Sequence, residues 1–236
     1  MGEAWDDPRI ARGMRTQLAE RARRIAAGER PLGWKVGLGA PAAMARLGIK
    51  GPLVGYLMET ARVASGEAVR LAGWAKPVAE PEIAVTIGRD LPGGADRAAA
   101  AAAIAALGPA IELADLDPPP DDVETILAGD IFQRHVILGR ADSARAGGRL
   151  EGLTGAVTRS GAETVRTAEL TVNTGDPVEI VRHVAGTLAA HGARLGAGDV
   201  VICGSVTPPV FLAPADTSFG FALEPIGGVA VRLLSR

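Results

Sequence analysis

Two glutamates that flank Pro81 are the residues most able to do chemistry. Glu80 and Glu82 stand just before the apolar run 83–87, which has the composition of a β-strand. In an extended chain, residues i and i+2 point to the same side, so we expect these two carboxylates to stand side by side. Two carboxylates at so short a distance repel each other. One of them must therefore take up a proton, or a cation must neutralise the pair.

Glu112 is the third candidate, because it is the only charge in the apolar segment 109–114. An unpaired buried carboxylate is costly, so Glu112 needs a cation or a strong hydrogen-bond donor. The chain between Glu82 and Glu112 has room for a strand, a helix and the start of a second strand, which can bring the two strands together. Three converging carboxylates suit Mg²⁺ or Mn²⁺. The alternative is a solvent-exposed Glu80 and Glu82, with Glu112 paired to an arginine.

Three weaker candidates are a lysine, a serine and a histidine. Lys35 lies in the glycine-rich segment 33–39; beside a metal it can act as a base or bind a carboxylate, and otherwise it is a strand-edge lysine that faces water. Ser205 follows an apolar strand, where a backbone amide and a hydroxyl can bind an oxyanion, or it forms an ordinary turn. No GxSxG motif surrounds Ser205, so a serine hydrolase is not indicated. His135 is the histidine best placed to line a site.

The elements that must position these residues are strands with helices inserted between them, without a regular βαβ series. This pattern predicts an α+β fold. A helix is expected from Pro8 to about residue 27, and an alanine-rich helix from Asp96 through Leu107. Hydrophobic runs predict strands at 53–58, 83–87, 110–114, 135–138, 200–203, 219–223 and 229–234, and a hairpin joins 153–159 to 164–172. One seam near residues 72–77 divides an N-terminal helical and strand region, 1–75, from a catalytic domain, 76–236.

Composition excludes several classes of protein. The chain has 236 residues, of which 47% are hydrophobic, so it can build a core and is not disordered. A net charge of −2 and 3% aromatic residues give no basic or stacking surface for nucleic acid. The single cysteine, Cys203, excludes a disulfide framework. No long apolar run predicts a transmembrane helix, and the acidic N-terminus does not have the pattern of a signal peptide. We therefore expect a cytoplasmic protein without nucleic-acid or membrane partners.

The same residues carry a family resemblance. The segments Gly-Trp-Lys-Val-Gly-Leu at 33–38, Glu-Pro-Glu-Ile-Ala at 80–84, Pro-Ala-Ile-Glu at 109–112 and Ala-Gly-Asp-Val-Val-Ile-Cys-Gly-Ser at 197–205 occur in this order. In this the chain resembles the 2-keto-4-pentenoate hydratase family, which also contains 2-oxo-3-hexenedioate decarboxylases and belongs to the fumarylacetoacetase superfamily. The resemblance implies a fumarylacetoacetase-type mixed β-roll or sandwich with peripheral helices, a small N-terminal region and a homo-oligomeric assembly.

The resemblance also implies roles for single residues. It makes Glu80, Glu82 and Glu112 the ligands of Mg²⁺ or Mn²⁺, makes Lys35 the active-site lysine, and places Ser205 close to the substrate. Leu53 stands where the family has an aspartate that works with the lysine, and with His135 it is expected to line the substrate pocket. Gly129-Asp130 stands in place of an Asp-Asn pair.

The activity implied is that of a metal-dependent hydro-lyase on small 2-oxo acids, namely hydration of 2-hydroxypenta-2,4-dienoate. The alternatives are a 2-oxo-3-hexenedioate-type decarboxylase, a fumarylpyruvate-type hydrolase, and a non-catalytic paralogue that binds 2-oxo acids. The last alternative follows from Leu53, because a missing acid weakens the acid–base end of the site.

Overall fold

The computed structural model describes residues 3–116 and 122–234. Five α-helices lie within this part of the chain, of which α1 and α5 are the longest: α1 (Pro8–Ala26), α2 (Pro41–Leu47), α3 (Arg97–Ala103), α4 (Val123–Ala128) and α5 (Pro177–Ala190). The first of these begins at Pro8 as its sequence predicts, and both long helices begin in the same way. Asp7 and Asp176 accept hydrogen bonds from backbone N–H groups of the first turn, and a proline occupies the first helical position of each.

Two sheets contain all the strands of the described residues. The larger has the order β2-β1-β10-β5-β6-β7-β3, with β11 paired to β5. Its strands are β1 (Pro31–Gly37), β2 (Leu53–Met58), β3 (Arg62–Val63), β5 (Pro77–Ile87), β6 (Ile104–Asp115), β7 (Gln133–Leu138), β10 (Val200–Ser205) and β11 (Val210–Phe211). The smaller has the order β4-β13-β12-β8-β9, with strands β4 (Ala68–Arg70), β8 (Thr154–Arg159), β9 (Ala162–Thr167), β12 (Ser218–Glu224) and β13 (Gly227–Leu234).

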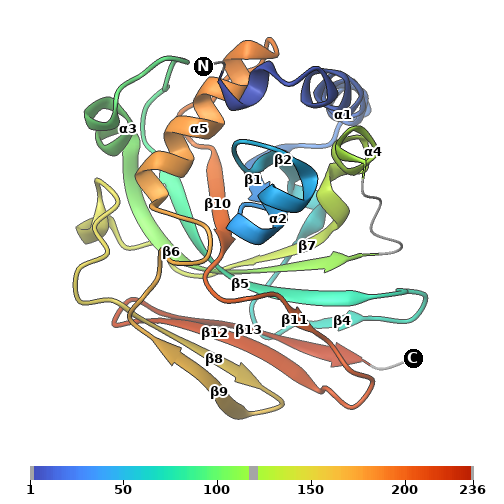
Figure 1. The fold of residues 1–236 in the computed structure, drawn as a ribbon. Helices are drawn as coiled ribbons and strands as arrows, with labels where there is room; N and C mark the ends of the chain where they lie inside the picture. Colours follow the sequence, from blue (N-terminus) through green and yellow to red (C-terminus); the bar gives the residue numbers. More distant parts are fainter. Residues whose placement is uncertain (1–2, 117–121, 235–236) are drawn as a thin grey trace.

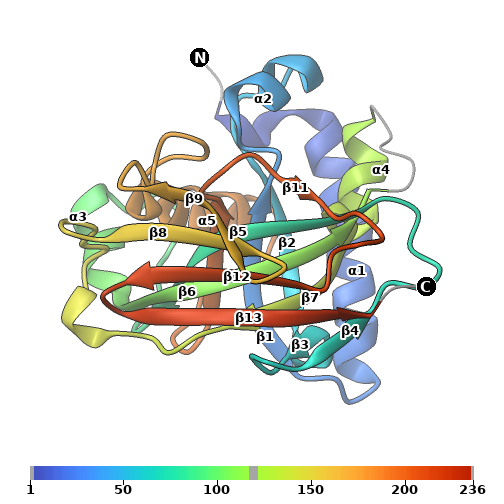
Figure 2. The same ribbon diagram turned by 90° about the horizontal axis from the view of Figure 1, so that it is seen from below.

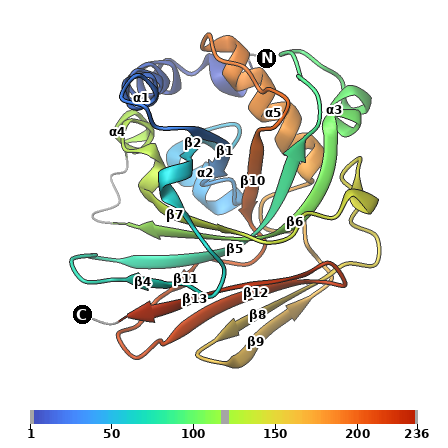
Figure 3. The same ribbon diagram turned by 180° about the vertical axis from the view of Figure 1, so that it is seen from behind.

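The larger sheet curls into a roll, and the smaller sheet packs against the outside of its long strands β5 and β6 (Figure 1). Figure 2 shows the smaller sheet face-on, in front of the roll. Phe219 and Phe221 of the smaller sheet are fully buried where the two sheets pack together. The helices lie on the outside of the roll, and seen from behind, α1 and α4 run side by side next to β2 and β7 (Figure 3). The mixed β-roll with peripheral helices confirms the predicted α+β fold.

The interior of the roll contains a small apolar cluster of its own. The buried residues of this cluster come from all the central strands: Leu32, Leu57, Ala84, Ala110, Val136 and Ile202. Lys35 pairs with Ile202, and Ile202 pairs with Ala84, so Lys35 faces the same interior. The opposite face of the sheet belongs to the main core, in which Trp34 and Val36 join residues of α1 and α5. The roll therefore has an inner surface that is separate from the main core.

The predicted strands are present, and two predicted lengths were wrong. The alanine-rich helix ends at Ala103 rather than at Leu107, because residues from Ile104 onward join β6, where Ala106 pairs with Thr86 of β5. Sheet pairing outweighs the helix propensity of alanine here. The second strand of the hairpin ends at Thr167 rather than at residue 172.

The predicted seam at 72–77 falls in the connection between β4 and β5. Strands from before and after this seam pair with each other: β1 with β10 in the larger sheet, and β4 with β13 in the smaller. The division into 1–75 and 76–236 stays a prediction. Among the described residues, no helix has the length and apolar character needed to cross a membrane.

Candidate metal centre and active site

Strands β5 and β6 bring the three glutamates together. Glu80 and Glu82 are two residues apart on β5, and Glu112 of β6 lies directly opposite Glu80 in the antiparallel register. One carboxylate oxygen of each residue lies within 4.8 Å of those of the other two. The expected pairing of the two strands, and the convergence of their carboxylates, are therefore present in the structure.

The environment of these carboxylates is apolar and short of donors. The side chains of Glu82 and Glu112 are fully buried, and neither Glu82 Oε1 nor Glu112 Oε2 has a hydrogen-bond partner among the described residues. Burial, followed by the charge of Glu112, raises the pKa of Glu80 to about 7 and raises that of Glu82 well above its ordinary value. Two carboxylate oxygens without partners in so small a space fit a divalent cation, because its positive charge would balance the negative charges of the carboxylates.

The strand β10 supplies one donor to this centre. The N–H of Gly204 donates to Glu82 Oε2 over 2.6 Å. Gly204 has a φ of +86° where the register between β10 and β5 shifts, and a side chain there would come within 2.8 Å of Thr174, so glycine suits both the backbone conformation and the close approach. Its neighbour Ser205 lies opposite Glu82, is 4% exposed, and has a hydroxyl oxygen without a partner in the described chain. The predicted Ser205 thus lies beside the glutamates with its hydroxyl available.

Lys35 comes from β1 and is buried in the roll, so it is not a strand-edge lysine facing water. Its Nζ donates to Glu112 Oε1, and also to the carbonyl oxygen of Ile131 over 3.3 Å. Burial acts to lower the pKa of Lys35, but the charges of Glu112 and Glu80 outweigh it, and the net pKa is raised. Lys35 is therefore an ammonium ion at neutral pH, and it is Lys35 rather than an arginine that pairs with Glu112.

A small cavity of about 130 Å³ opens beside these groups. Its walls come from the turn after β1, from α2, from the loop before α5 and from the end of β10: Val36, Gly37, Leu38, Gly39, Ala40, Ala43, Glu80, Asn173, Thr174, Gly204, Ser205 and Pro209. Asn173 Nδ2 donates to the carbonyl oxygens of Ser205 and Thr207, so its amide N–H groups are already engaged. The cavity has room for a small molecule in contact with Glu80 and Ser205.

The structure places the two remaining predicted residues differently. Leu53 is buried on β2 opposite Gly37 and packs in the main core rather than in the small cluster inside the roll, and it is not among the residues that line the cavity. His135 pairs with Leu113, whose side chain points away from that of its neighbour Glu112. The His135 ring stacks on Trp74, with ring centroids 5.9 Å apart. The structure therefore does not bring His135 together with the other candidates.

Sequence reasoning did not single out one acidic neighbour of Lys35. Asp130, in the 3₁₀ turn η3 (Asp130–Phe132), is 9% exposed, and its Oδ1 accepts the N–H of Tyr56 over 2.9 Å. Burial raises the pKa of Asp130 to about 8, and the nearby Lys35 ammonium acts in the opposite direction. The signal that could have found it was the pair Gly129-Asp130, which marked a departure from the family pattern.

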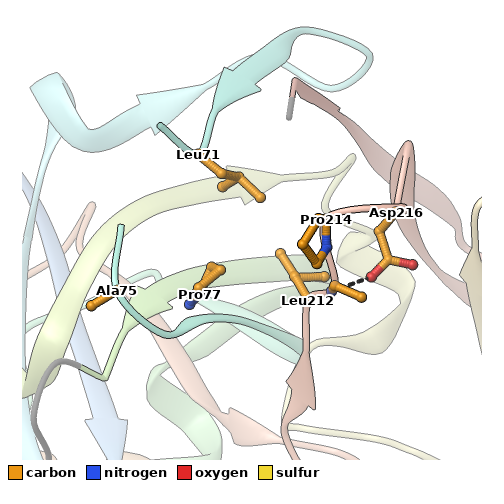
Figure 4. Close-up of a pocket in the computed structure, with 7 residues that line it drawn as sticks. Leu71, Ala75, Pro77, Leu212, Pro214 and Asp216 are labelled. Carbon is orange, nitrogen blue, oxygen red and sulfur yellow. Dashed lines mark hydrogen bonds between the residues drawn. The ribbon is translucent and has the colours of Figure 1, made fainter. Parts of the chain in front are cut away.

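A second cavity, of about 220 Å³, lies between the β4–β5 connection and the segment that follows β11, and none of the three glutamates lines it (Figure 4). Its walls are mainly apolar: Leu71, Ala75, Pro77, Leu212, Ala213, Pro214 and Asp216. The Asp216 carboxylate accepts the N–H of Ala213 over 2.6 Å and is paired with Arg159. Asp216 is the only charged residue that lines this cavity, and it is already paired. The cavity therefore has fewer free polar groups for a substrate than the one beside the glutamates.

Comparison with known proteins identifies the class to which this fold and site belong. The model of the fumarylacetoacetate (FAA) hydrolase C-terminal family matches residues 36–233. The chain therefore belongs to this family, and the resemblance seen in the sequence is confirmed.

The more specific relatives carry the names of hydratases and decarboxylases. The 2-hydroxyhexa-2,4-dienoate hydratase of Comamonas testosteroni is 28% identical over 214 residues, which cover 89% of this chain and 80% of that protein. The TodF product hydratase of Pseudomonas putida strain F1 is 31% identical, covering 88% of this chain and 78% of that protein. Among solved structures, 4-oxalocrotonate decarboxylase from Pseudomonas putida G7, complexed with magnesium and adipate, superposes with a TM-score of 0.82 at 27% identity, covering 92% of this chain and 83% of that one.

Proposed function

We propose that this chain is a metal-dependent hydro-lyase that acts on small 2-oxo acids, with hydration of 2-hydroxypenta-2,4-dienoate as its reaction. The observation that carries the proposal is the convergence of three carboxylates, within 4.8 Å of one another, beside a buried ammonium group and a small cavity. Relatives named as hydratases and decarboxylases support the same class of reaction.

In this proposal Glu80, Glu82 and Glu112 hold Mg²⁺ or Mn²⁺. The cation supplies a Lewis acid that stabilises the negative charge of an enolate formed from a 2-oxo acid. The fit rests on the two buried carboxylate oxygens without partners and on oxygen ligands of the kind that these cations prefer.

The chain's own groups bind and orient the substrate. Ser205 Oγ lines the cavity without an engaged hydrogen bond and can donate to a substrate oxygen. Lys35 keeps a positive charge next to Glu112, where it faces the negative charge that develops on the substrate, and its Nζ can donate a proton. The surrounding apolar cluster excludes water and so strengthens both interactions.

The cavity lining favours a substrate with an uncharged tail. The residues that line it include no lysine, arginine or histidine, and Leu38, Ala40, Ala43 and Pro209 form an apolar wall. A second carboxylate on the substrate would lose its hydration there without gaining a cation. This favours the dienoate hydratase over reactions of diacids, such as decarboxylation of 2-oxo-3-hexenedioate or hydrolysis of fumarylpyruvate.

The decarboxylase is the second candidate, because the solved 4-oxalocrotonate decarboxylase has a similar fold over 92% of this chain. Loss of CO₂ from a vinylogous 2-oxo diacid passes through the same type of dienolate, so the same metal and lysine would serve it.

The test is the ultraviolet absorbance of 2-hydroxypenta-2,4-dienoate with purified protein and Mg²⁺ or Mn²⁺. Loss of the band with 4-hydroxy-2-oxovalerate as product, abolished by EDTA, is the expected result. Release of CO₂ from 2-oxo-3-hexenedioate, with no hydration of the dienoate, would replace the hydratase with the decarboxylase. Tight binding of 2-oxo acids without turnover of any of them would indicate the non-catalytic paralogue.

We also propose that the protein works in the cytoplasm as a homo-oligomer. The resemblance to the family supports an assembly, and the single buried cysteine suits a reducing compartment. Light scattering of the purified protein, which gives the molar mass in solution, tests the oligomer; a mass of 24.1 kDa would contradict it.

A further inference from the structure

The turn that carries Asp130 has an unusual backbone. Asp130, Ile131 and Phe132 have φ values of +54°, +53° and +66°, a left-handed conformation that side chains other than glycine rarely adopt. Such conformations are unfavourable by themselves and persist only where the surroundings impose them. Three in succession indicate that packing around the turn holds it in place.

Two helices supply that packing. Helix α4 leads directly into the turn, and α1 packs along α4 (Figure 3). The fully buried Gln17 of α1 donates to the carbonyl oxygen of Leu127 in α4 over 2.9 Å. Gly13 allows the close contact, because a side chain there would come within 2.6 Å of Leu127. The end of α4, and hence the start of the turn, is fixed from outside the roll.

The turn presents two oxygen-bearing groups to Lys35. The carbonyl oxygen of Ile131 accepts from Lys35 Nζ over 3.3 Å. A side chain at Gly55 would lie 2.8 Å from Asp130 Oδ1 and 2.9 Å from Lys35 Cγ. The Asp130 carboxyl group and the Lys35 side chain therefore both lie next to the space that a side chain at residue 55 would occupy. This space is free only because residue 55 is a glycine.

Lys35 needs a second set of contacts if Glu112 binds a cation. In the structure the ammonium group donates to Glu112 Oε1, an oxygen of the proposed metal centre. A cation held by Glu112 would draw electron density from this carboxylate and would weaken its hydrogen bond to Lys35. The groups on the other side of Lys35 then decide whether the ammonium keeps its place in the roll.

We propose that Asp130 is a positioning residue for Lys35, which holds the lysine side chain between the η3 turn and the metal centre during the reaction. The inference rests on the proposed function for the role of Lys35, but the contacts that carry it belong to the η3 turn. Asp130 also places an acidic side chain near Lys35, where the sequence pattern lacks one at Leu53.

The test compares Asp130→Asn with Asp115→Asn. The first variant keeps the size of the side chain and an oxygen that can accept the N–H of Tyr56, but removes the acidic group. Asp115 is the matched control: it is also buried, and it accepts the N–H of Lys76 over 2.8 Å at the C-terminal end of β6. Asp130→Asn should lower kcat about 100-fold, the loss typical of a displaced catalytic group, with KM changed less than about threefold. Asp115→Asn should leave kcat within about threefold.

A second readout follows Lys35 directly. The chain has three lysines, Lys35, Lys50 and Lys76, so ¹⁵N-lysine labelling gives an NMR spectrum in which Lys35→Arg identifies the Lys35 signal. Asp130→Asn should shift this ammonium signal or broaden it by faster exchange with water, and Asp115→Asn should not. In the wild-type protein the Lys35 signal, once assigned, should remain visible when Mg²⁺ is added.

Several results would overturn the proposal. One is a kcat within threefold of wild type in Asp130→Asn. Another is a Lys35 signal that does not move in Asp130→Asn, even if this variant is less stable, since a loss of stability alone would make Asp130 a purely structural residue. Disappearance of the wild-type signal on addition of Mg²⁺ would also contradict it. If the wild-type protein turns over no 2-oxo acid, the proposed function fails, while the NMR comparison still decides the role of Asp130.

Discussion

Replacing Glu82 with glutamine separates metal binding from folding. Glutamine has nearly the same size, and its carbonyl oxygen can still accept the N–H of Gly204, which lies 2.6 Å from Glu82 Oε2. The change removes the negative charge at Oε1, which has no other partner in the described chain. We therefore expect Glu82→Gln to fold and to lose its affinity for Mg²⁺ and Mn²⁺.

The size of the effect follows from linkage. A ligand at 100 times its Kd stabilises the native state by about 2.7 kcal/mol. In a domain of this size, 1 kcal/mol shifts Tm by about 2–4 °C, so saturating Mg²⁺ should raise the Tm of the wild-type protein by about 5–11 °C. Glu82→Gln should show a shift below about 2 °C.

Without metal, the Glu82→Gln variant should be at least as stable as the wild-type protein. The folded-state pKa of Glu82 is raised by burial, so its contribution to stability is present at low pH and is lost as the pH rises through that pKa. Glutamine has no such loss. At pH 8 without metal, Glu82→Gln should therefore melt at or above the temperature of the wild-type protein.

Calorimetric melting of EDTA-treated protein at pH 8, with and without MgCl₂ or MnCl₂, measures both effects. Glu163→Gln is the control, because Glu163 is exposed and paired with Arg166 on the outer hairpin, and its metal shift should equal that of the wild type. A full metal shift in Glu82→Gln would refute the assignment of this residue as a ligand. No shift in the wild type would refute the metal centre as a whole.

Three further variants test the neighbouring groups. Lys35→Met should lower turnover by roughly 10²–10⁴-fold while Mg²⁺ still raises Tm, since the lysine is not a ligand; loss of the metal shift would contradict this. Gly55→Ala should cost about 1–3 kcal/mol in urea unfolding, because the added methyl group would lie 2.8 Å from Asp130 Oδ1, and an unchanged midpoint would argue against that contact. Burial lowers the pKa of His183, so its contribution to stability is full above about pH 6.5 and falls as the pH drops further. His183→Asn should flatten the decline in Tm between pH 7 and 5, and an equally steep decline would show that other groups cause it.

The carboxylate pair on β5 could be predicted from the sequence because strand geometry is local. The alternation of side chains in an extended chain places Glu80 and Glu82 on one face whatever the rest of the fold does. The register that sets Glu112 opposite Glu80 could be proposed only as a possibility, since it depends on how β5 and β6 pair. Helix α3 lies between them, and its early end at Ala103 adds residues to β6 that propensity alone had assigned to the helix.

The surroundings of Lys35 and His135 could not be predicted, because they depend on the curl of the larger sheet. A lysine between glycines has the pattern of an exposed edge residue, yet β1 is paired on both sides, with β2 and β10. His135 lies next to residues of the roll interior in sequence, but strand alternation turns it to the opposite face, where it stacks on Trp74. Proximity in sequence to a site says little when neighbouring residues face opposite sides of a sheet.

The curl also explains how an apolar interior can accommodate so much charge. Lys35 comes from one part of the roll and Glu112 from another, and neither local sequence contains its partner. Only the closure of β1 against β10, and of β10 against β5, brings the ammonium group to the carboxylates. One ammonium group cannot balance three carboxylates, so a divalent cation would complete the charge of the site. Metal binding and closure of the roll should therefore stabilise each other.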